Sequence, residues 1–388
     1  MRVTFVANFM NHHQLPFSEK MLEMTGGEYC FVAHSPIYAG QISLGYEDMN
    51  MLPFVIRAYD GPESYERALE RILNDDMVIF GGCPNEWVEM RAKTGKPFLI
   101  YSERFFKKGT WRRFIPLTYK KIYDRMIKFK KHNMAVICSS AFLPYDLKLL
   151  HSDIRTIKWG YFPAIKRFES LDALVDSKKK NTLVWVGRFI QWKHPETPVY
   201  LAQKLKNEGY DFELRMIGNG ALLDKTRALV ERLGLQGNVI LTGAMPAAQV
   251  REEMEKAQIM ITTSDEYEGW GAVVNEAMSS ACTVIASHLM GSVPFLLKDG
   301  ENGLVYRFGN EADLYNKVTS VMDNRAYGDR LARNAYDTIC DMWSAENAAT
   351  RLMSIIQDMI SNREINFYED GPCSRAQVIK PKISRKGT

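Results

Sequence analysis

The chain has 388 residues, of which 46% are hydrophobic and 25% are charged, and its formal net charge is +4. This composition excludes a disordered or low-complexity chain, and the length is typical of two globular domains. No apolar run approaches the roughly 18 residues of a membrane-spanning helix. The six cysteines include no Cys-x-x-Cys pair, so buried free thiols are expected rather than a disulfide framework.

The first half of the chain alternates short apolar runs with helical patterns. Strands are predicted at 2–8, 29–34, 53–58, 76–81, 97–102, 134–139 and near 157–161. Helices are predicted at 14–24, 62–74, 85–94, 111–131 and 142–150. Alternation of this kind predicts an α/β domain with a parallel sheet and helices on both faces.

A change of composition marks the end of this first domain, which we place at residues 1–165. Residues 166–180 turn polar and end in Lys178-Lys179-Lys180, as expected of a linker. The strand and helix alternation then restarts and predicts a second parallel-sheet domain at 181–343. An amphipathic helix is predicted within 344–362, and we expect the tail, 363–388, to be loosely held.

The most informative stretch of the second domain runs from Ser264 to Met278. It follows an apolar strand at 258–262 and contains a Gly-Trp-Gly turn that opens into a helix of small residues. The free N–H groups and partial positive charge of a helix N-terminus suit a phosphate. Glu268 precedes the turn, and Glu276 lies about 8 Å further along the helix axis. Two glutamates at this spacing are by themselves more often solvated helix charges.

In this setting the pattern resembles a known enzyme family. Glu268-x7-Glu276, followed by residues 282–287 and an Asp-Gly-Glu-Asn-Gly turn at 299–303, resembles the retaining glycosyltransferases of family four, including those that build bacterial surface polysaccharides. The resemblance implies a GT-B fold, in which two Rossmann-like domains face a cleft and a C-terminal helix crosses back to the first domain. The N-terminal domain of such an enzyme binds the acceptor, and the C-terminal domain binds a nucleotide sugar.

The resemblance also implies the reaction: retaining, metal-independent transfer of a hexosyl group from a nucleotide-diphosphate sugar to a glycan or lipid-linked acceptor. Arg188 and Lys193 lie five residues apart after a strand and match the family's pair that neutralises the leaving diphosphate, although such residues alone are usually surface charges. Neither a cofactor nor a metal is expected, and no Asp-x-Asp occurs in the chain. The donor-binding residues implied by the resemblance are Gly187, Gly218, Asn219, Met245, Gly269, Trp270, Gly271, Ala272, Val273 and Glu276.

The acceptor side departs from the family pattern. His12 and His13 stand where relatives often have glycines, and either could hydrogen-bond the donor phosphates or the acceptor hydroxyl. The alternative is a helix-capping region with incidental histidines. Residues 100–104 lack the histidine that many relatives place there. Glu103 is the candidate that replaces it in orienting or deprotonating the acceptor, and it could instead only pair with Arg104.

A basic stretch suggests where the protein works. Residues 104–131 contain eleven basic residues and one acidic residue, a net charge of +10, so the rest of the chain carries −6. Aromatic residues are interleaved with this charge, and six apolar residues at helical spacing form one face: Ile115, Tyr119, Ile122, Tyr123, Met126 and Ile127. A core-packed helix with a solvated basic side is one interpretation.

We favour reversible binding to an anionic membrane, with a cytoplasmic protein held peripherally on the inner face of the plasma membrane. The residues predicted to make this contact are Lys107, Lys108, Arg112 and Arg113. Two alternative functions are a GT-B sugar-nucleotide epimerase and a nucleotide-sugar-binding protein without turnover. Nucleic-acid binding would rest on the basic stretch alone, and no nucleic-acid motif supports it.

Overall fold

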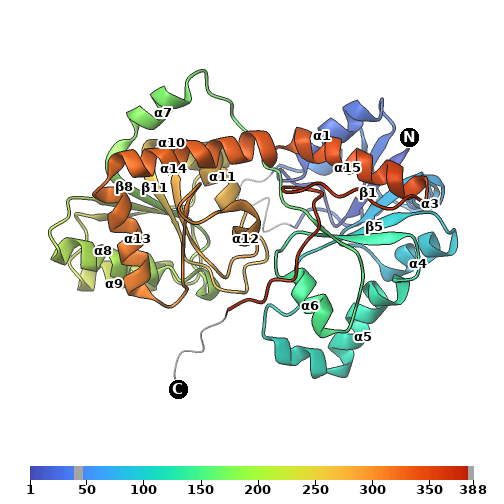
Figure 1. The fold of residues 1–388 in the computed structure, drawn as a ribbon, viewed down its shortest axis with the longest axis horizontal. Coiled ribbons are helices and arrows are strands. Elements are labelled where there is room, and N and C mark those ends of the chain that lie inside the picture. Colours follow the sequence, from blue (N-terminus) through green and yellow to red (C-terminus); the bar gives the residue numbers. More distant parts are fainter. Residues whose placement is uncertain (39–46, 383–388) are drawn as a thin grey trace. The chain divides into compact units, whose positions relative to one another are not determined.

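The computed structural model describes residues 1–38 and 47–382, which divide into two compact units (Figure 1). Unit 1 contains Met1–Ala164 and Trp343–Lys380, and unit 2 contains Ile165–Met342. Each unit is built around a parallel sheet whose strands are mostly buried, as expected when helices cover both faces. The predicted fold class, two Rossmann-like α/β domains, is confirmed.

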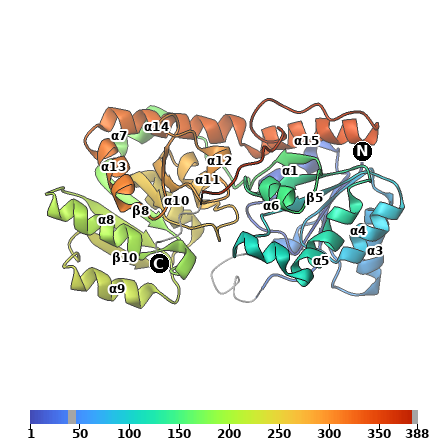
Figure 2. The ribbon, with the colours of Figure 1, turned by 60° about the horizontal axis from the view of Figure 1, so that its bottom comes forward.

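Unit 1 has a seven-stranded sheet in the order β3-β2-β1-β4-β5-β6-β7. Its strands are β1 (Val3–Ala7), β2 (Tyr29–Ala33), β3 (Val55–Arg57), β4 (Met77–Phe80), β5 (Phe98–Ser102), β6 (Met134–Cys138) and β7 (Thr156–Lys158). Its helices are α1 (Leu15–Met24), α3 (Pro62–Asn74), α4 (Asn85–Lys93), α5 (Pro116–Arg125), α6 (Leu143–Leu149) and α15 (Ala345–Ile360), with short 3-10 turns η1 (Met49–Met51), η2 (Thr110–Phe114) and η3 (Ile127–Phe129). α15 lies alongside α1, and α3, α4 and α5 follow one another on the other side of the sheet (Figures 1 and 2).

Unit 2 has a six-stranded sheet in the order β10-β9-β8-β11-β12-β13. Its strands are β8 (Lys179–Val186), β9 (Glu213–Ile217), β10 (Val239–Gly243), β11 (Ala257–Thr262), β12 (Thr283–Ser287) and β13 (Leu304–Tyr306). Its helices are α7 (Leu171–Ser177), α8 (Glu196–Asn207), α9 (Leu223–Arg232), α10 (Ala247–Lys256), α11 (Val273–Ser279), α12 (Val293–Leu296), α13 (Glu311–Met322) and α14 (Arg325–Asp337), with the short turns η4 (Gln191–Lys193) and η5 (Thr338–Met342). Apolar side chains of α8, α9 and α13 form the core on one face of this sheet.

Three expectations need correction. The single helix predicted at 111–131 is instead η2, α5 and η3, because Pro116 starts a new helix and Ile115 before it is extended. Its predicted apolar face is also divided, since Ile122, Met126 and Ile127 are buried while Tyr119 and Tyr123 are exposed.

The predicted linker at 166–180 and the loosely held tail also differ from the structure. Residues 171–177 form α7. Lys178 is buried, and burial lowers its pKa. Its ammonium donates hydrogen bonds to four backbone carbonyls, which stabilise the charge in place of water. In the tail, Cys373 and Ser374 are buried, and residues 373–376 hydrogen-bond along β7. All six cysteines are unpaired, and five of them are buried.

None of the helices in the described residues is both long and apolar enough to span a bilayer.

The order of the strands places the loops of each unit where a ligand can bind. In each sheet the chain first builds strands to one side of its central strand and later returns to build strands on the other side. Such switch points, β1/β4 in unit 1 and β8/β11 in unit 2, are where open parallel sheets bind ligands, outside the carboxyl ends of the strands.

Candidate active site

The predicted donor-side residues of unit 2 gather at its switch point. The loop after β8 carries Arg188 and Lys193, and the loop after β11 carries Glu268. The Lys193 ammonium and the Glu268 carboxylate form an ion pair at 2.5 Å, with side chains only 14% and 16% exposed. Two residues that are 75 positions apart in the sequence therefore meet because their strands are neighbours.

Further hydrogen bonds fix the two loops to each other. The Thr263 hydroxyl donates to the Lys193 carbonyl at 2.6 Å, and the Asp265 N–H donates to the Trp192 carbonyl at 3.1 Å. Below them the buried Trp185 indole N–H donates to the Thr263 hydroxyl at 2.8 Å. The position of the lysine is thus set by its backbone as well as by its charge.

His194 is a charged member of this site that the sequence analysis missed. Its ring nitrogens lie 3.0 Å from carboxylate oxygens of Glu196 and Asp265. Burial lowers the pKa of the imidazole, but the hydrogen bonds and negative charges of the two carboxylates outweigh this and raise it to about 9. His194 is therefore protonated at neutral pH. Its position directly after Lys193 was a usable signal, but its partner Asp265 is distant in sequence.

The predicted glycines of the β9 loop serve a close backbone approach. Gly218 has a φ of +139°, and a Cβ there would collide with the Gly187 carbonyl oxygen. The Phe189 N–H donates to the Asn219 carbonyl at 2.9 Å. The loops after β8 and β9 are consequently joined backbone to backbone. Arg188 remains exposed, with its guanidinium 5.5 Å from the Trp192 ring centroid.

The Gly-Trp-Gly turn is partly structural. The Trp270 side chain is buried, and its indole N–H donates to the Asn275 side chain at 2.9 Å, so only the backbone of residue 270 is left to face a donor. Gly271 has a φ of +88° and packs against Met290. Ala272 precedes α11 without a side-chain cap, Val273 is its first residue, and Glu276 is half-buried in its first turn.

The other motifs of unit 2 have clear places. Met245 follows β10 and is half-buried, while neighbouring Gly243 accepts a hydrogen bond from the Gly218 N–H. The Asp-Gly-Glu-Asn-Gly motif forms a turn before β13. The Asp299 carboxylate accepts from the Val305 N–H, and the buried Asn302 side chain donates to the Leu296 carbonyl. This motif thus stabilises a turn.

In unit 1, the two histidines follow β1. The His12 and His13 ring centroids are 3.8 Å apart, and His13 stacks on Tyr161 at 5.6 Å. Burial lowers the pKa of His13 to about 4, so this ring is neutral at pH 7 and could serve a ligand as a hydrogen-bonding group rather than as a cation. His13 lines a small cavity of about 170 Å³ together with Asn8 and Tyr101.

Glu103 follows β5 and is held by two neighbours. Its carboxylate forms an ion pair with Lys107 and accepts from the Tyr161 hydroxyl at 2.7 Å. The suggested pair with Arg104 is wrong, because the Arg104 side chain is buried and pairs with buried Asp146 at 3.1 Å. Burial raises the pKa of Tyr161 well above its usual range, so its hydroxyl stays protonated and acts as a donor.

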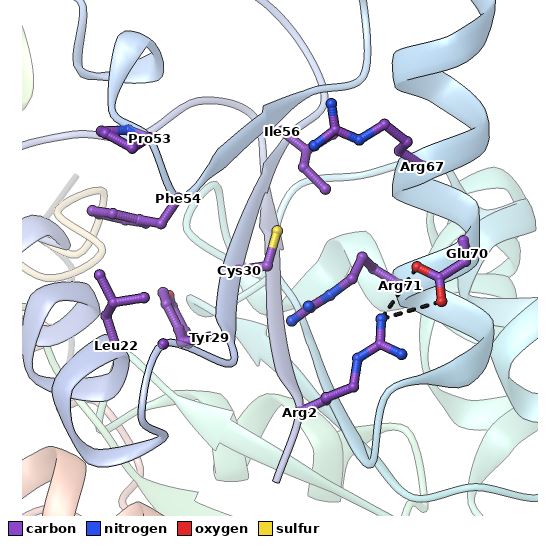
Figure 3. Close-up of a pocket in the computed structure, with 11 residues that line it drawn as sticks. Arg2, Leu22, Tyr29, Cys30, Pro53, Phe54, Ile56, Arg67, Glu70 and Arg71 are labelled. Atoms are coloured by element: carbon purple, nitrogen blue, oxygen red, sulfur yellow. Dashed lines mark hydrogen bonds and ion pairs between the residues drawn. The ribbon is translucent and has the colours of Figure 1, made fainter.

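A further pocket lies at the opposite, amino-terminal edge of the unit 1 sheet (Figure 3). It has a volume of about 670 Å³, and two of its three arginines, Arg2 and Arg71, are engaged by carboxylates. Arg2 contacts Glu70 and Asp75, and Arg71 contacts Asp75 at 2.8 Å. Ligands of open parallel sheets bind at the carboxyl edge, and because this pocket lies at the other edge it is not the candidate site.

Comparison with known proteins finds a family match that lies within unit 2. Residues 167–338 match the family model described as glycosyl transferases group 1. The poly(ribitol-phosphate) alpha-N-acetylglucosaminyltransferase of Staphylococcus aureus is 22% identical over 170 residues, which cover 44% of this chain and 34% of that relative. The lipopolysaccharide 1,6-galactosyltransferase of Salmonella typhimurium is 24% identical over 241 residues, covering 60% and 61%. The chain thus spans less than two thirds of each relative.

Solved structures share the whole fold. HepE of Anabaena, in complex with UDP, has a TM-score of 0.67 at 13% identity and covers 92% of this chain and 100% of its own. A glycosyltransferase of Rickettsia africae has a TM-score of 0.66 at 18% identity, covering 93% and 99%. These likenesses show that the chain shares the two-domain GT-B architecture of the solved structures.

The charge of His194 predicts a specific pH dependence. Its pKa is about 9 in the folded protein against an ordinary 6.5, so its stabilisation is complete below pH 6.5 and is lost as pH rises through 9. We expect wild-type protein to lose up to about 3 kcal/mol of unfolding free energy across this window through His194. His194→Gln should lack that loss, whereas His132→Gln, at an exposed site, should keep it. Urea unfolding at pH 6 and 9.5 measures the difference; identical pH dependence in wild type and His194→Gln would contradict the assignment.

Proposed function

We propose that the chain is a retaining, metal-independent hexosyltransferase that uses a nucleotide-diphosphate sugar. The observation that carries this proposal is the cluster of Arg188, Lys193 and Glu268 at the switch point of unit 2, inside the segment that matches the family model. We further propose a glycan or lipid-linked acceptor in bacterial surface polysaccharide or glycolipid synthesis, on the basis of the names of the relatives.

The proposed chemistry uses the cations of unit 2 at the leaving group. The bond between the anomeric carbon and the phosphate oxygen breaks, and its electron pair stays on the nucleotide diphosphate. The acceptor oxygen bonds to the anomeric carbon and gives up its proton to a base, for which Glu103 is the candidate. Negative charge grows on the leaving oxygen, so Arg188 and Lys193 would stabilise the transition state more than the bound substrate.

The ion pair suggests how Glu268 would enter the reaction. Glu268 neutralises Lys193 in this structure. A bound diphosphate would compete for the same ammonium and leave the carboxylate to accept hydrogen bonds from sugar hydroxyls. Glu276, further along α11, is proposed to accept hydrogen bonds from the ribose. In unit 1 Glu103, held by Lys107 and Tyr161, is proposed to orient or deprotonate the acceptor.

We also propose peripheral binding to the inner face of the plasma membrane. Residues 111–123 expose large apolar side chains beside basic ones: Trp111 at 60%, Phe114 at 73%, Leu117 at 79%, and Tyr119 and Tyr123 at 42% each. The Arg113 guanidinium lies 4.4 Å from the Phe114 ring centroid. Aromatic and basic side chains together suit an anionic membrane interface.

Arg188→Ala and Lys193→Ala should each reduce sugar transfer by about 100-fold or more, because each removes a cation from the leaving group. A thermal-shift screen with UDP-, GDP- and ADP-sugars first identifies the donor, since a tighter ligand stabilises more. Turnover is then measured at saturating donor, with Arg232→Ala at an exposed site of unit 2 as control. Wild-type turnover in either variant would refute their role. Turnover of the donor without any acceptor would favour the sugar-nucleotide epimerase. Binding of the donor without turnover would favour a nucleotide-sugar-binding protein.

Glu276→Ala and Glu268→Ala should affect different steps. Loss of Glu276 should weaken binding of the free nucleotide diphosphate by roughly tenfold, as expected for a lost charged hydrogen bond. Loss of Glu268 should mainly lower the turnover number, and it should not weaken nucleotide binding, because it frees Lys193. Calorimetry with nucleotide diphosphate and steady-state kinetics separate the two. Equal losses of nucleotide affinity in both variants would show this division to be incorrect.

Membrane binding should be reversible, salt-sensitive and specific to anionic lipid. Lys108→Gln/Arg113→Gln should weaken it about tenfold or more, since each basic residue near the surface contributes roughly 1 kcal/mol. Phe114→Ser/Leu117→Ser should weaken it further, while Ile240→Ser, an exposed apolar site in unit 2, should not. Sedimentation with anionic and neutral vesicles at two salt concentrations measures this. Equal pelleting of wild type with both vesicle types would rule the proposal out.

A further inference from the structure

The charge of residues 104–131 is only partly free. Five of the eleven basic side chains pair with carboxylates: Arg104 with Asp146, Lys107 with Glu103, Lys120 with Asp124, Lys128 with Glu89, and Lys130 with Asp153. Within the part of the chain that the structure describes, the other six have no carboxylate at ion-pair distance. Four of these six, Lys108, Arg112, Lys121 and Arg125, line one pocket.

This pocket has a volume of about 1000 Å³ and lies within unit 1. It sits at the carboxyl ends of β4 and β5, against η2 and α5, and Asn8 after β1 also lines it. It therefore occupies the switch point of the first sheet, the edge at which a parallel sheet binds ligands. Its size suits a ligand larger than a single ion.

One wall of the pocket is a glycine loop that leads into a helix. Gly81 and Gly82 follow β4, and Gly82 packs so closely on Asn8 that any side chain at 82 would displace it. Asn85, the first residue of the nine-residue helix α4, lines the pocket. Proline at position 84 precedes the helix, and no side chain caps its first turn. Backbone N–H groups at such a helix start are natural donors to an anion.

Arg125 fixes a positive charge against this loop. Its guanidinium donates to the Cys83 carbonyl at 3.2 Å and also to the Gly81 carbonyl. Both partners are neutral, so the charge is held in place without being cancelled. One carboxylate, Glu103, lines the pocket, and Lys107 already pairs with it. The pocket consequently presents a strong excess of positive charge to a ligand.

We propose that this pocket binds the phosphoryl groups of an anionic ligand, a phosphate monoester or a diphosphate. Arginine guanidinium groups grip two phosphate oxygens at once, lysines add point charges, and the start of α4 adds backbone donors. The identification of this ligand as the phosphate-bearing part of the acceptor rests on the proposed function. Anion binding itself rests only on the pocket.

The test is calorimetric titration of the full chain with inorganic diphosphate and with glycerol 3-phosphate. Arg112→Gln/Lys121→Gln removes two pocket cations that have no carboxylate partner among the described residues, and it should weaken binding at least tenfold. Lys120→Gln/Lys131→Gln makes the same change of charge on exposed side chains that do not line the pocket, and should change affinity less than twofold. Glycerol, the uncharged analogue, should not bind.

Arg188→Gln distinguishes binding at the donor site of unit 2 from binding in the unit 1 pocket, because it should leave the pocket-dependent binding intact. Absence of saturable binding in wild type, equal losses in the pocket and control variants, or loss of all binding in Arg188→Gln would each overturn the proposal. Pocket-dependent binding together with no sugar transfer would refute the proposed function and leave this inference standing.

A last arm distinguishes a soluble phosphate ligand from a lipid-borne one. A short-chain prenyl diphosphate is titrated in parallel with inorganic diphosphate. Tighter binding of the prenyl compound that is reduced by Phe114→Ser/Leu117→Ser would identify a lipid diphosphate as the preferred source. Equal affinities, both dependent on Arg112 and Lys121, would identify a soluble phosphate ester. Either result supports phosphoryl recognition by the pocket.

Discussion

The ion pair between Lys193 and Glu268 is the contact on which the geometry of unit 2 depends. Both side chains are largely removed from water, and removing one partner from such a pair leaves an uncompensated charge that costs several kcal/mol. The pair therefore adds to the hydrogen bonds that join the loops after β8 and β11, and another anion at Lys193 would compete with Glu268. A ligand with a diphosphate is an anion of that kind, and its binding would change the role of Glu268 without moving the lysine backbone, which Thr263 holds.

The two units use one construction for different purposes. In each, the switch point joins the first strand of the unit to a strand that follows later. Close glycine packing lies at this point in unit 1, at Gly82, and beside it in unit 2, where Gly218 after β9 approaches Gly187 after β8. In unit 2 the added charges include a carboxylate, Glu268, and a protonated histidine, His194, so cations and anions are balanced at short range. In unit 1 the charges that line the pocket are mostly uncompensated cations. The same edge of the fold thus carries two different arrangements of charge in the two units.

Much of the fold could be predicted from the sequence, because buried parallel strands appear as apolar runs. All seven strands expected in unit 1 are present, and the Gly-Trp-Gly turn and α11 lie where the pattern places them. The breaks in the 111–131 helix were also visible in principle, since Pro116 cannot continue a helix that begins before it. The Lys193–Glu268 pair was not visible, because it depends on β8 lying beside β11. The burial of Lys178 was not visible for a similar reason. Its place in a run of three lysines suggested a solvent-exposed linker, but its ammonium is buried and donates to four backbone carbonyls that are distant in sequence.

Charge counting treats the eleven basic residues of 104–131 as one group, whereas the structure divides them into three. Five cations are matched by carboxylates and stabilise local packing, as the buried Arg104–Asp146 pair does most clearly. Four more converge on the unit 1 pocket, where Arg125 is held by neutral carbonyls. Only Arg113 and Lys131 are left outside both groups, and Arg113 lies against exposed Phe114. Net charge therefore overstates what a flat membrane surface would meet, and the apolar side chains of η2 and α5 must supply much of any membrane affinity. A pocket of unpaired cations beside such an apolar surface is the arrangement expected for a ligand whose phosphate is buried while its remaining part lies at an interface.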